Sequence, residues 1–209
     1  MRDKIKWFGT VAAIQPRIRL SRSFDQRSHV YLGYALRIDG SAGGRTQTFS
    51  VGIGKSLHAK QGIQAGDGVE GCCHPVEHPE LESVDFYKVS SFRRLTQSRV
   101  GHPSPPPWLG VPPPLEVYRS RGHRRLAAQT YESDCGPCIW GCKMAVEMII
   151  DQWNPSQRKY RYETFCYGPK SCPRYKAGPP RKVPGRKGMS WTEEDWADED
   201  ATSHRSADE

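Results

Sequence analysis

The stretch "WFGTVAAIQPRIRL" (residues 7–20) opens a series of segments that have the composition of β-strands. It is rich in Val, Ile and Phe, and apolar and polar residues alternate along parts of it, which indicates a strand. Four similar segments follow: "HVYLGYALRID" (29–39), "RTQTFSVGI" (45–53), "DGVEGCCHPV" (67–76) and "VDFYKVSSFRRL" (84–95). Turn residues separate them, as in "DGSAGG" (39–44) and "AGDG" (65–68). We therefore expect five strands within residues 1–96.

The segment "GKSLHAKQGIQ" (54–64), between the third and fourth of these strands, has the composition of a short helix or turn. Five strands with a helical connection at this point resemble the architecture of an OB-fold, a partly open five-stranded barrel. The resemblance lies in the order of elements, and no diagnostic motif accompanies it. It implies an OB-like β-barrel over residues 1–96, with an SH3-like small barrel as the structural alternative.

Three further regions follow the predicted barrel. Residues 97–114 contain "GHPSPPPWLGVPPP", which predicts a stiff, extended connector or a strap held by Trp108 and Leu109. Residues 115–188 form a basic, cysteine-rich region in which an apolar run that includes Met144, Val146 and Met148 predicts one helix at about 138–153. The acidic residues 189–209 predict a tail that is disordered beyond a short helix.

Five of the seven cysteines fall within the cysteine-rich region, residues 115–188: Cys135, Cys138, Cys142, Cys166 and Cys172. This region has few other core-forming residues, so we expect a metal to staple it into a small, irregular unit that contains the helix. A four-cysteine zinc site and a [4Fe–4S] cluster each need four thiolates. We predict a structural Zn²⁺ ion, with a [4Fe–4S] cluster as the alternative; the fifth cysteine is unexplained by both.

The tetrapeptide Cys135-Gly136-Pro137-Cys138 is identical to the active-site motif of thioredoxins, which it resembles over these few residues only. The resemblance implies a redox couple in which a helix start lowers the pKa of Cys135. Elsewhere, the adjacent Cys72 and Cys73 lie in a predicted strand, where alternation sends one to the core and one to the surface. The sequence contains no phosphate-binding glycine loop and no Ser/His/Asp set.

The net charge of +8 and the pI of about 9.2 point to a polyanionic partner, of which nucleic acid is the commonest. OB-folds bind single strands by stacking bases on aromatic side chains in a basic groove. The loop after the first strand (17–29) and the start of the second strand supply a first set of candidate contacts: Arg17, Arg19, Arg22, Phe24 and Arg27 from the loop and Tyr31 from the strand. The cysteine-rich region supplies a second set: Arg121, Arg124, Arg125, Lys170, Arg174, Lys176, Arg181 and Lys182.

We therefore predict a protein that binds single-stranded or structured nucleic acid and has a structural metal site and no catalysis of its own. One alternative is an iron–sulfur or thiol redox enzyme that uses Cys135–Cys142. A second is a scaffold that meets a protein partner through the proline-rich connector or the acidic tail. The N-terminus lacks the apolar core of a secretory signal and no apolar run approaches 18 residues, so we expect a cytoplasmic protein without a membrane partner.

Overall fold

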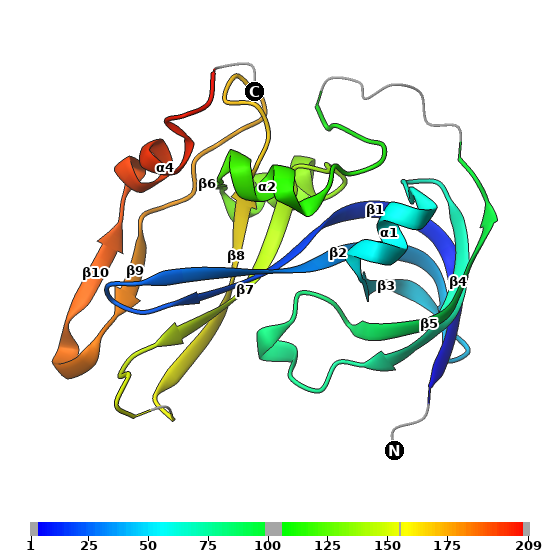
Figure 1. Ribbon diagram of the computed structural model, residues 1–209, viewed down its shortest axis with the longest axis horizontal. Helices are drawn as coiled ribbons and strands as arrows, with labels where there is room; N and C mark the ends of the chain where they lie inside the picture. The colour runs from blue at the N-terminus through cyan, green and yellow to red at the C-terminus, as the bar shows by residue number, and fades with distance from the viewer. Residues whose placement is uncertain (1–3, 99–105, 155, 207–209) are drawn as a thin grey trace.

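The computed structural model describes residues 4–98, 106–154 and 156–206, and the chain is mainly β (Figure 1). The strands are β1 (Ile5–Arg22), β2 (Arg27–Ala42), β3 (Arg45–Ile53), β4 (Gly68–Pro75), β5 (Phe86–Thr96), β6 (Arg124–Arg125), β7 (Gly141–Ile149), β8 (Arg158–Cys166), β9 (Arg181–Pro184) and β10 (Ser190–Glu193). The α-helices are α1 (Lys55–Gln61), α2 (Leu115–Arg121), α3 (Ala128–Thr130) and α4 (Asp195–Thr202). Three short turns of other helix types are η1 (Pro79–Leu81), η2 (Tyr131–Cys135) and η3 (Arg186–Gly188). Within the described residues, no helix has the length and apolar character needed to cross a membrane.

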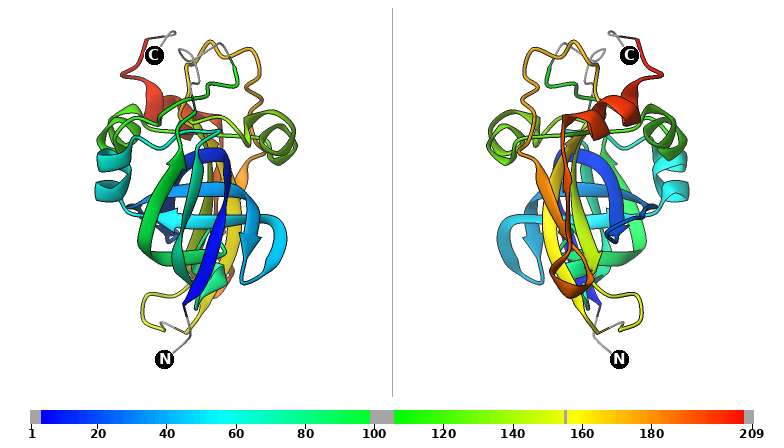
Figure 2. Two further views of the ribbon diagram at one scale, coloured as in Figure 1. Left: turned by 90° about the vertical axis from the view of Figure 1, so that its right-hand side faces the viewer. Right: turned by 90° about the vertical axis from the view of Figure 1, so that its left-hand side faces the viewer.

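The first five strands close into a ring. Their order around it is β1–β2–β3–β5–β4, and β4 pairs back to β1. The side chains of Leu36, Phe49, Val51 and Val69 are buried among the apolar residues that the ring encloses. The helix α1 connects β3 to β4 and lies on the outside of the ring (Figure 2). The five predicted strands and the helical connection between the third and fourth are thus confirmed.

The strand β1 belongs both to the ring and to the region beyond it. It pairs with β2 along most of its 18 residues. On its other edge it pairs first with β4, through Ile5–Thr10, and later with β7, through Arg19–Arg22. Pro16, which has no backbone N–H to donate, lies in the interval between these two partners. One strand therefore carries the sheet from the ring into the cysteine-rich region.

The cysteine-rich region extends the main sheet through β7, β8 and β6. The predicted helix at about 138–153 is wrong, because residues 141–149 form β7. Along this strand Cys142, Met144, Val146 and Met148 alternate into the apolar core, while Lys143 is exposed. The core cluster that holds these four side chains also holds those of the ring.

The acidic tail is ordered where the structure describes it, up to residue 206, which corrects the prediction of disorder. It forms β10, which pairs with β9, and then α4. Of the proline-rich connector, residues 99–105 lie outside the described part of the chain. The rest packs along the protein: the Tyr34 hydroxyl donates to the Pro113 carbonyl (2.8 Å), and the Ile139 amide donates to the Trp108 carbonyl (2.9 Å).

Gly33 lies at an irregularity in the pairing of β1 with β2. The register passes from Arg17 opposite Gly33 to Ile18 opposite Tyr31, so one residue of β2 has no counterpart. Gly33 has a φ of 137°, and a Cβ atom there would lie 2.0 Å from the Ile53 carbonyl oxygen at the end of β3. Only glycine fits this bend of β2 against β3.

Gly33→Ala should therefore lower the free energy of unfolding by about 3 kcal/mol or more, because it adds a collision with backbone to an unfavourable φ. Gly44→Ala is the matched control: its φ is 79°, and a Cβ there meets no atom within 4 Å. We expect Gly44→Ala to lower the free energy of unfolding by about 1–2 kcal/mol, because only its φ is unfavourable for alanine. Denaturant unfolding of both variants measures the difference, and equal losses would contradict the proposed collision.

Candidate functional site

The arginines of β1 that were predicted to contact nucleic acid are held by an acidic residue of the ring. Arg17 donates from Nε (2.9 Å) and from a terminal nitrogen (2.7 Å) to one oxygen of Glu82, and all but 9 % of this arginine is buried. Arg19 donates to the other oxygen of Glu82 (2.9 Å) and to the Leu81 carbonyl (2.8 Å). Glu82 lies in the segment between β4 and β5, so these ion pairs fix that segment to β1.

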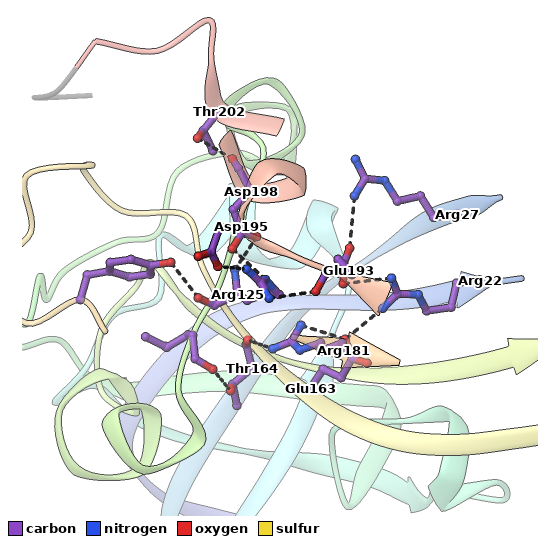
Figure 3. Close-up of polar contacts among 12 residues, drawn as sticks. Arg22, Arg27, Arg125, Glu163, Thr164, Arg181, Glu193, Asp195, Asp198 and Thr202 are labelled. Atoms are coloured by element: carbon purple, nitrogen blue, oxygen red, sulfur yellow. Dashed lines mark hydrogen bonds and ion pairs between the residues drawn. The ribbon is translucent and has the colours of Figure 1, made fainter. Parts of the chain in front are cut away.

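At the end of β1, Arg22 is buried among carboxylates from distant parts of the chain (Figure 3). Its guanidinium lies 2.9 Å from Glu193 of β10 and 3.4 Å from Glu163 of β8, and its side chain is 1 % exposed. Arg181 of β9 shares Glu163 at 2.8 Å, and Arg27 lies 3.4 Å from Glu193. A charge buried as deeply as those of Arg22 and Arg181 needs partners of opposite sign, so these two arginines serve the fold, whereas Arg27 is exposed.

Arg125 ties the acidic tail to the sheet in the same way (Figure 3). Its side chain is fully buried and donates to Asp198 (2.9 Å), to Asp195 (2.5 Å) and to the Glu193 carbonyl (2.9 Å). Its backbone amide also donates to Asp198 (2.9 Å). The tail therefore contributes carboxylates to the interior of the protein.

The other predicted contacts are divided between internal packing and the surface. The guanidinium of Arg121 lies over Trp140, and that of Arg124 lies over Tyr175. Tyr31 lies beneath the guanidinium of Arg119, and Arg174 pairs with Asp134 at 3.4 Å. The side chains of six predicted residues are exposed: Phe24, Arg27, Lys170, Arg174, Lys176 and Lys182. Phe24 lines a pocket of about 330 Å³ together with Trp191 and Trp196.

An aromatic surface that the sequence did not indicate lies on the β7–β8 hairpin. Trp153, in the turn between the two strands, is 85 % exposed, and Tyr160 and Tyr162 of β8 are 40 % and 46 % exposed. The ammonium of Lys143 lies 4.9 Å from the ring centre of Tyr162. Arg158 lies on the same face as the two tyrosines, where it pairs with Glu147. We call these five residues — Lys143, Trp153, Arg158, Tyr160 and Tyr162 — the hairpin face.

Four of the five candidate metal-ligating cysteines gather at the opposite end of the hairpin from Trp153. Cys135 and Cys138 precede β7, whereas Cys166 ends β8 and Cys172 follows it. Cys135 and Cys166 belong to a small apolar cluster, separate from the main core, that also contains Leu126. The Gln15 side chain of β1 donates to the carbonyls of Cys135 and Cys138, both at 2.9 Å, and so positions the first turn.

The fifth cysteine, Cys142, faces the other way. Its side chain is fully buried in the main core, and its thiol donates to the Pro16 carbonyl at 3.3 Å. Within the described parts of the chain, no three or more His, Cys, Asp or Glu side chains are placed, as they stand, so that they could hold a metal ion. The predicted set of five ligands is therefore not brought together.

The thiols of the Cys135–Cys138 turn are protonated at neutral pH. Burial raises the pKa of Cys135 to about 12 and that of Cys138 to about 11. Cys135 ends η2, and a strand follows Cys138, so the helix start on which the redox interpretation depends is missing. A thiol without metal in this environment is a poor nucleophile.

A buried histidine lies beside the arginines at the end of β1. His29 of β2 has its ring 4.8 Å from that of His123, which is itself buried. Burial, together with the positive charges of Arg27 and Arg22, lowers the pKa of His29 from 6.5 to about 4, and Glu193 opposes this effect. His29 is therefore neutral in the folded protein at neutral pH.

The free energy of unfolding should fall as the pH is lowered from about 6.5 to about 4. In this range the unfolded chain binds a proton at His29 and the folded chain does not. The free energy of unfolding therefore falls by about 3 kcal/mol across the whole range. His29→Phe should remove that part of the pH dependence, as measured by denaturant unfolding at several pH values. His78→Phe, which replaces an exposed histidine, is the control. Parallel curves for the parent and His29→Phe would contradict the prediction.

Comparison of the chain with protein-family models, curated proteins and solved structures finds no significant match. The chemistry of the exposed residues therefore carries the functional argument. Two features stand out from the ion-paired interior: the hairpin face and the four cysteines at the base of the same hairpin.

Proposed function

We propose that this protein binds single-stranded nucleic acid and that the hairpin face is the contact surface. The observation that carries the proposal is the gathering of three exposed aromatic side chains beside basic ones on a single hairpin. Single-strand binding proteins stack bases on such rings and track the phosphates with basic side chains. Stacking tolerates any base because every base has a π-face, so we expect little sequence preference.

The architecture of the ring supports this proposal. We infer that the ring is an OB-like barrel, because its strand order and the position of α1 match those of that fold. In OB-folds the loops after the first and fourth strands border the binding surface. Here the segment after β4 is in contact with the hairpin face, since the Tyr162 hydroxyl donates to the Glu82 carbonyl at 2.9 Å. The hairpin face would thus extend the usual surface at one rim.

The internal ion pairs reduce the number of basic residues that are free to bind phosphate. Most of the arginines first predicted to bind phosphate are ion-paired within the protein and are unsuited to that role. Lys143 is exposed beside Tyr162 on the hairpin face, whereas Lys159 is exposed on the opposite face of β8 and Lys182 is exposed on β9. Contacts from such residues to phosphate release counterions, so the affinity should fall steeply as salt is added.

Trp153→Ala and Tyr160→Ala should each weaken the binding of a labelled single-stranded oligonucleotide by roughly 5- to 150-fold, which corresponds to 1–3 kcal/mol per stacked base. Fluorescence anisotropy titrations at two salt concentrations measure both the loss and the salt dependence. Phe8→Ala is the matched control, because Phe8 is an aromatic residue with 58 % exposure on the part of β1 that pairs with β4.

Two results would contradict the proposal. One is a parent protein that does not bind the oligonucleotide even at low salt. The other is a loss for Phe8→Ala as large as that for Trp153→Ala, which would separate binding from the hairpin face. Binding that is unaffected by either hairpin substitution would move the contact surface elsewhere on the protein.

A further inference from the structure

Four cysteines meet at the base of the β7–β8 hairpin because of the pairing of its strands. The two strands are antiparallel, and Gly141 lies opposite Cys166. The turn that contains Cys135 and Cys138 enters β7 at this end, and the turn that contains Cys166 and Cys172 leaves β8 there. Cys135 of the first turn and Cys166 of the second belong to one small buried cluster, so the two turns meet there. Two pairs of cysteines from two turns at the base of a hairpin are typical of zinc ribbons.

A backbone amide points at one of these sulfur atoms, and this is a second sign of ligation. The Gly168 amide donates to the Cys166 sulfur at 3.4 Å. In the first turn, the Gly141 amide donates to the Cys138 carbonyl at 3.0 Å, and the Cys138 amide donates to the Cys135 carbonyl at 3.1 Å. A thiol is a weak acceptor and has little need of such donors, whereas a thiolate that ligates a metal is stabilised by them.

A positive charge also lies beside the cluster. The terminal nitrogens of the Arg124 side chain donate to the carbonyls of Pro169 (2.9 Å) and Lys170 (3.3 Å), which lie between Cys166 and Cys172. Arg124 is therefore held against the turn that carries the second pair of cysteines. Four thiolates on a divalent ion have a net charge of −2, and a fixed guanidinium at this position offsets part of it.

We propose that Cys135, Cys138, Cys166 and Cys172 ligate one zinc ion as four thiolates and that Cys142 is a core residue. Four thiolates fill the tetrahedral coordination of zinc and leave no open position, so the site is structural. Because the side chains as they stand do not form a ligand set, the sulfur atoms must turn toward a common point when the ion binds. The ion would join the entry of β7 to the exit of β8 and fix the base of the hairpin.

This site is independent of nucleic-acid binding and is tested without it. The full-length protein, purified without added metal, should contain about one zinc ion per chain by elemental analysis. Replacement of the zinc by Co²⁺ should give the visible absorption of a tetrahedral thiolate site, with a charge-transfer intensity that reports four sulfur ligands.

Cys172→Ser is the discriminating variant, because Cys172 is half-exposed and its replacement disturbs the core little. Its zinc content after dialysis against a chelator should fall by at least about tenfold relative to the parent. Cys72→Ser is the matched control: Cys72 is also half-exposed, lies on β4 and should be replaceable without loss of zinc.

Three outcomes would overturn the proposal. A parent protein that contains no zinc and gives no cobalt spectrum would remove the site. Iron with an equal amount of inorganic sulfide would replace the zinc ion by a cluster. Full zinc content in Cys172→Ser would show that the ligand set is different.

Discussion

The pairing of β1 with three other strands is the interaction on which the rest of the structure depends. Each backbone N–H and C=O of a buried strand needs a partner, and β1 obtains them from β2 on one edge and from β4 and then β7 on the other. Its length therefore decides that the ring and the cysteine-rich region share one sheet and one apolar core. In the interval between β4 and β7, Gln15 and Pro16 meet residues of the cysteine-rich region instead of a strand. A shift of β1 by one residue would turn its buried side chains to the other face and would break these contacts as well.

The second constraint is the burial of charge where the tail meets the sheet. Arg22 and Arg125 have almost no exposed surface, so each requires carboxylates, and β10 and α4 supply most of them (Figure 3). The acidic tail is therefore placed by electrostatics as well as by the pairing of β10 with β9. The same ion pairs explain why the net charge of +8 is a poor guide to the binding surface. Much of the positive charge that the sequence displays is used inside the protein, and the basic residues left on the surface are mostly lysines.

The ring could be predicted from the sequence because its signals are local. Period-two alternation, turn residues and the short segment around α1 located five strands and one helix within a few residues of their bounds. The β7–β8 hairpin could not be predicted in the same way. Met144, Met148 and their neighbours fit a helical face, yet Cys142, Met144, Val146 and Met148 also have the period of a strand, and pairing with β1 selects the strand. Because that pairing joins residues more than a hundred positions apart, no local pattern indicated the hairpin or the aromatic side chains on its outer face. The placement of four cysteines at one end of the hairpin depends on the pairing of β7 with β8.

The two ends of this hairpin differ in chemistry: the base is held by contacts within the protein, whereas the tip presents an aromatic side chain to solvent. At its base, the connector contributes Trp108, whose carbonyl accepts from the Ile139 amide, and β1 contributes Gln15. Contacts from these two segments hold the base of the hairpin in position. At the other end, Trp153 lies in a turn with most of its surface in water. A rigid base and an exposed aromatic tip allow the tip to meet a flexible ligand without a rearrangement of the sheet, because the geometry of β8 fixes the spacing between Tyr160 and Tyr162. A metal at the base would therefore act on binding only through the position of the strands, which is why the role of the cysteines and that of the aromatic residues can be separated.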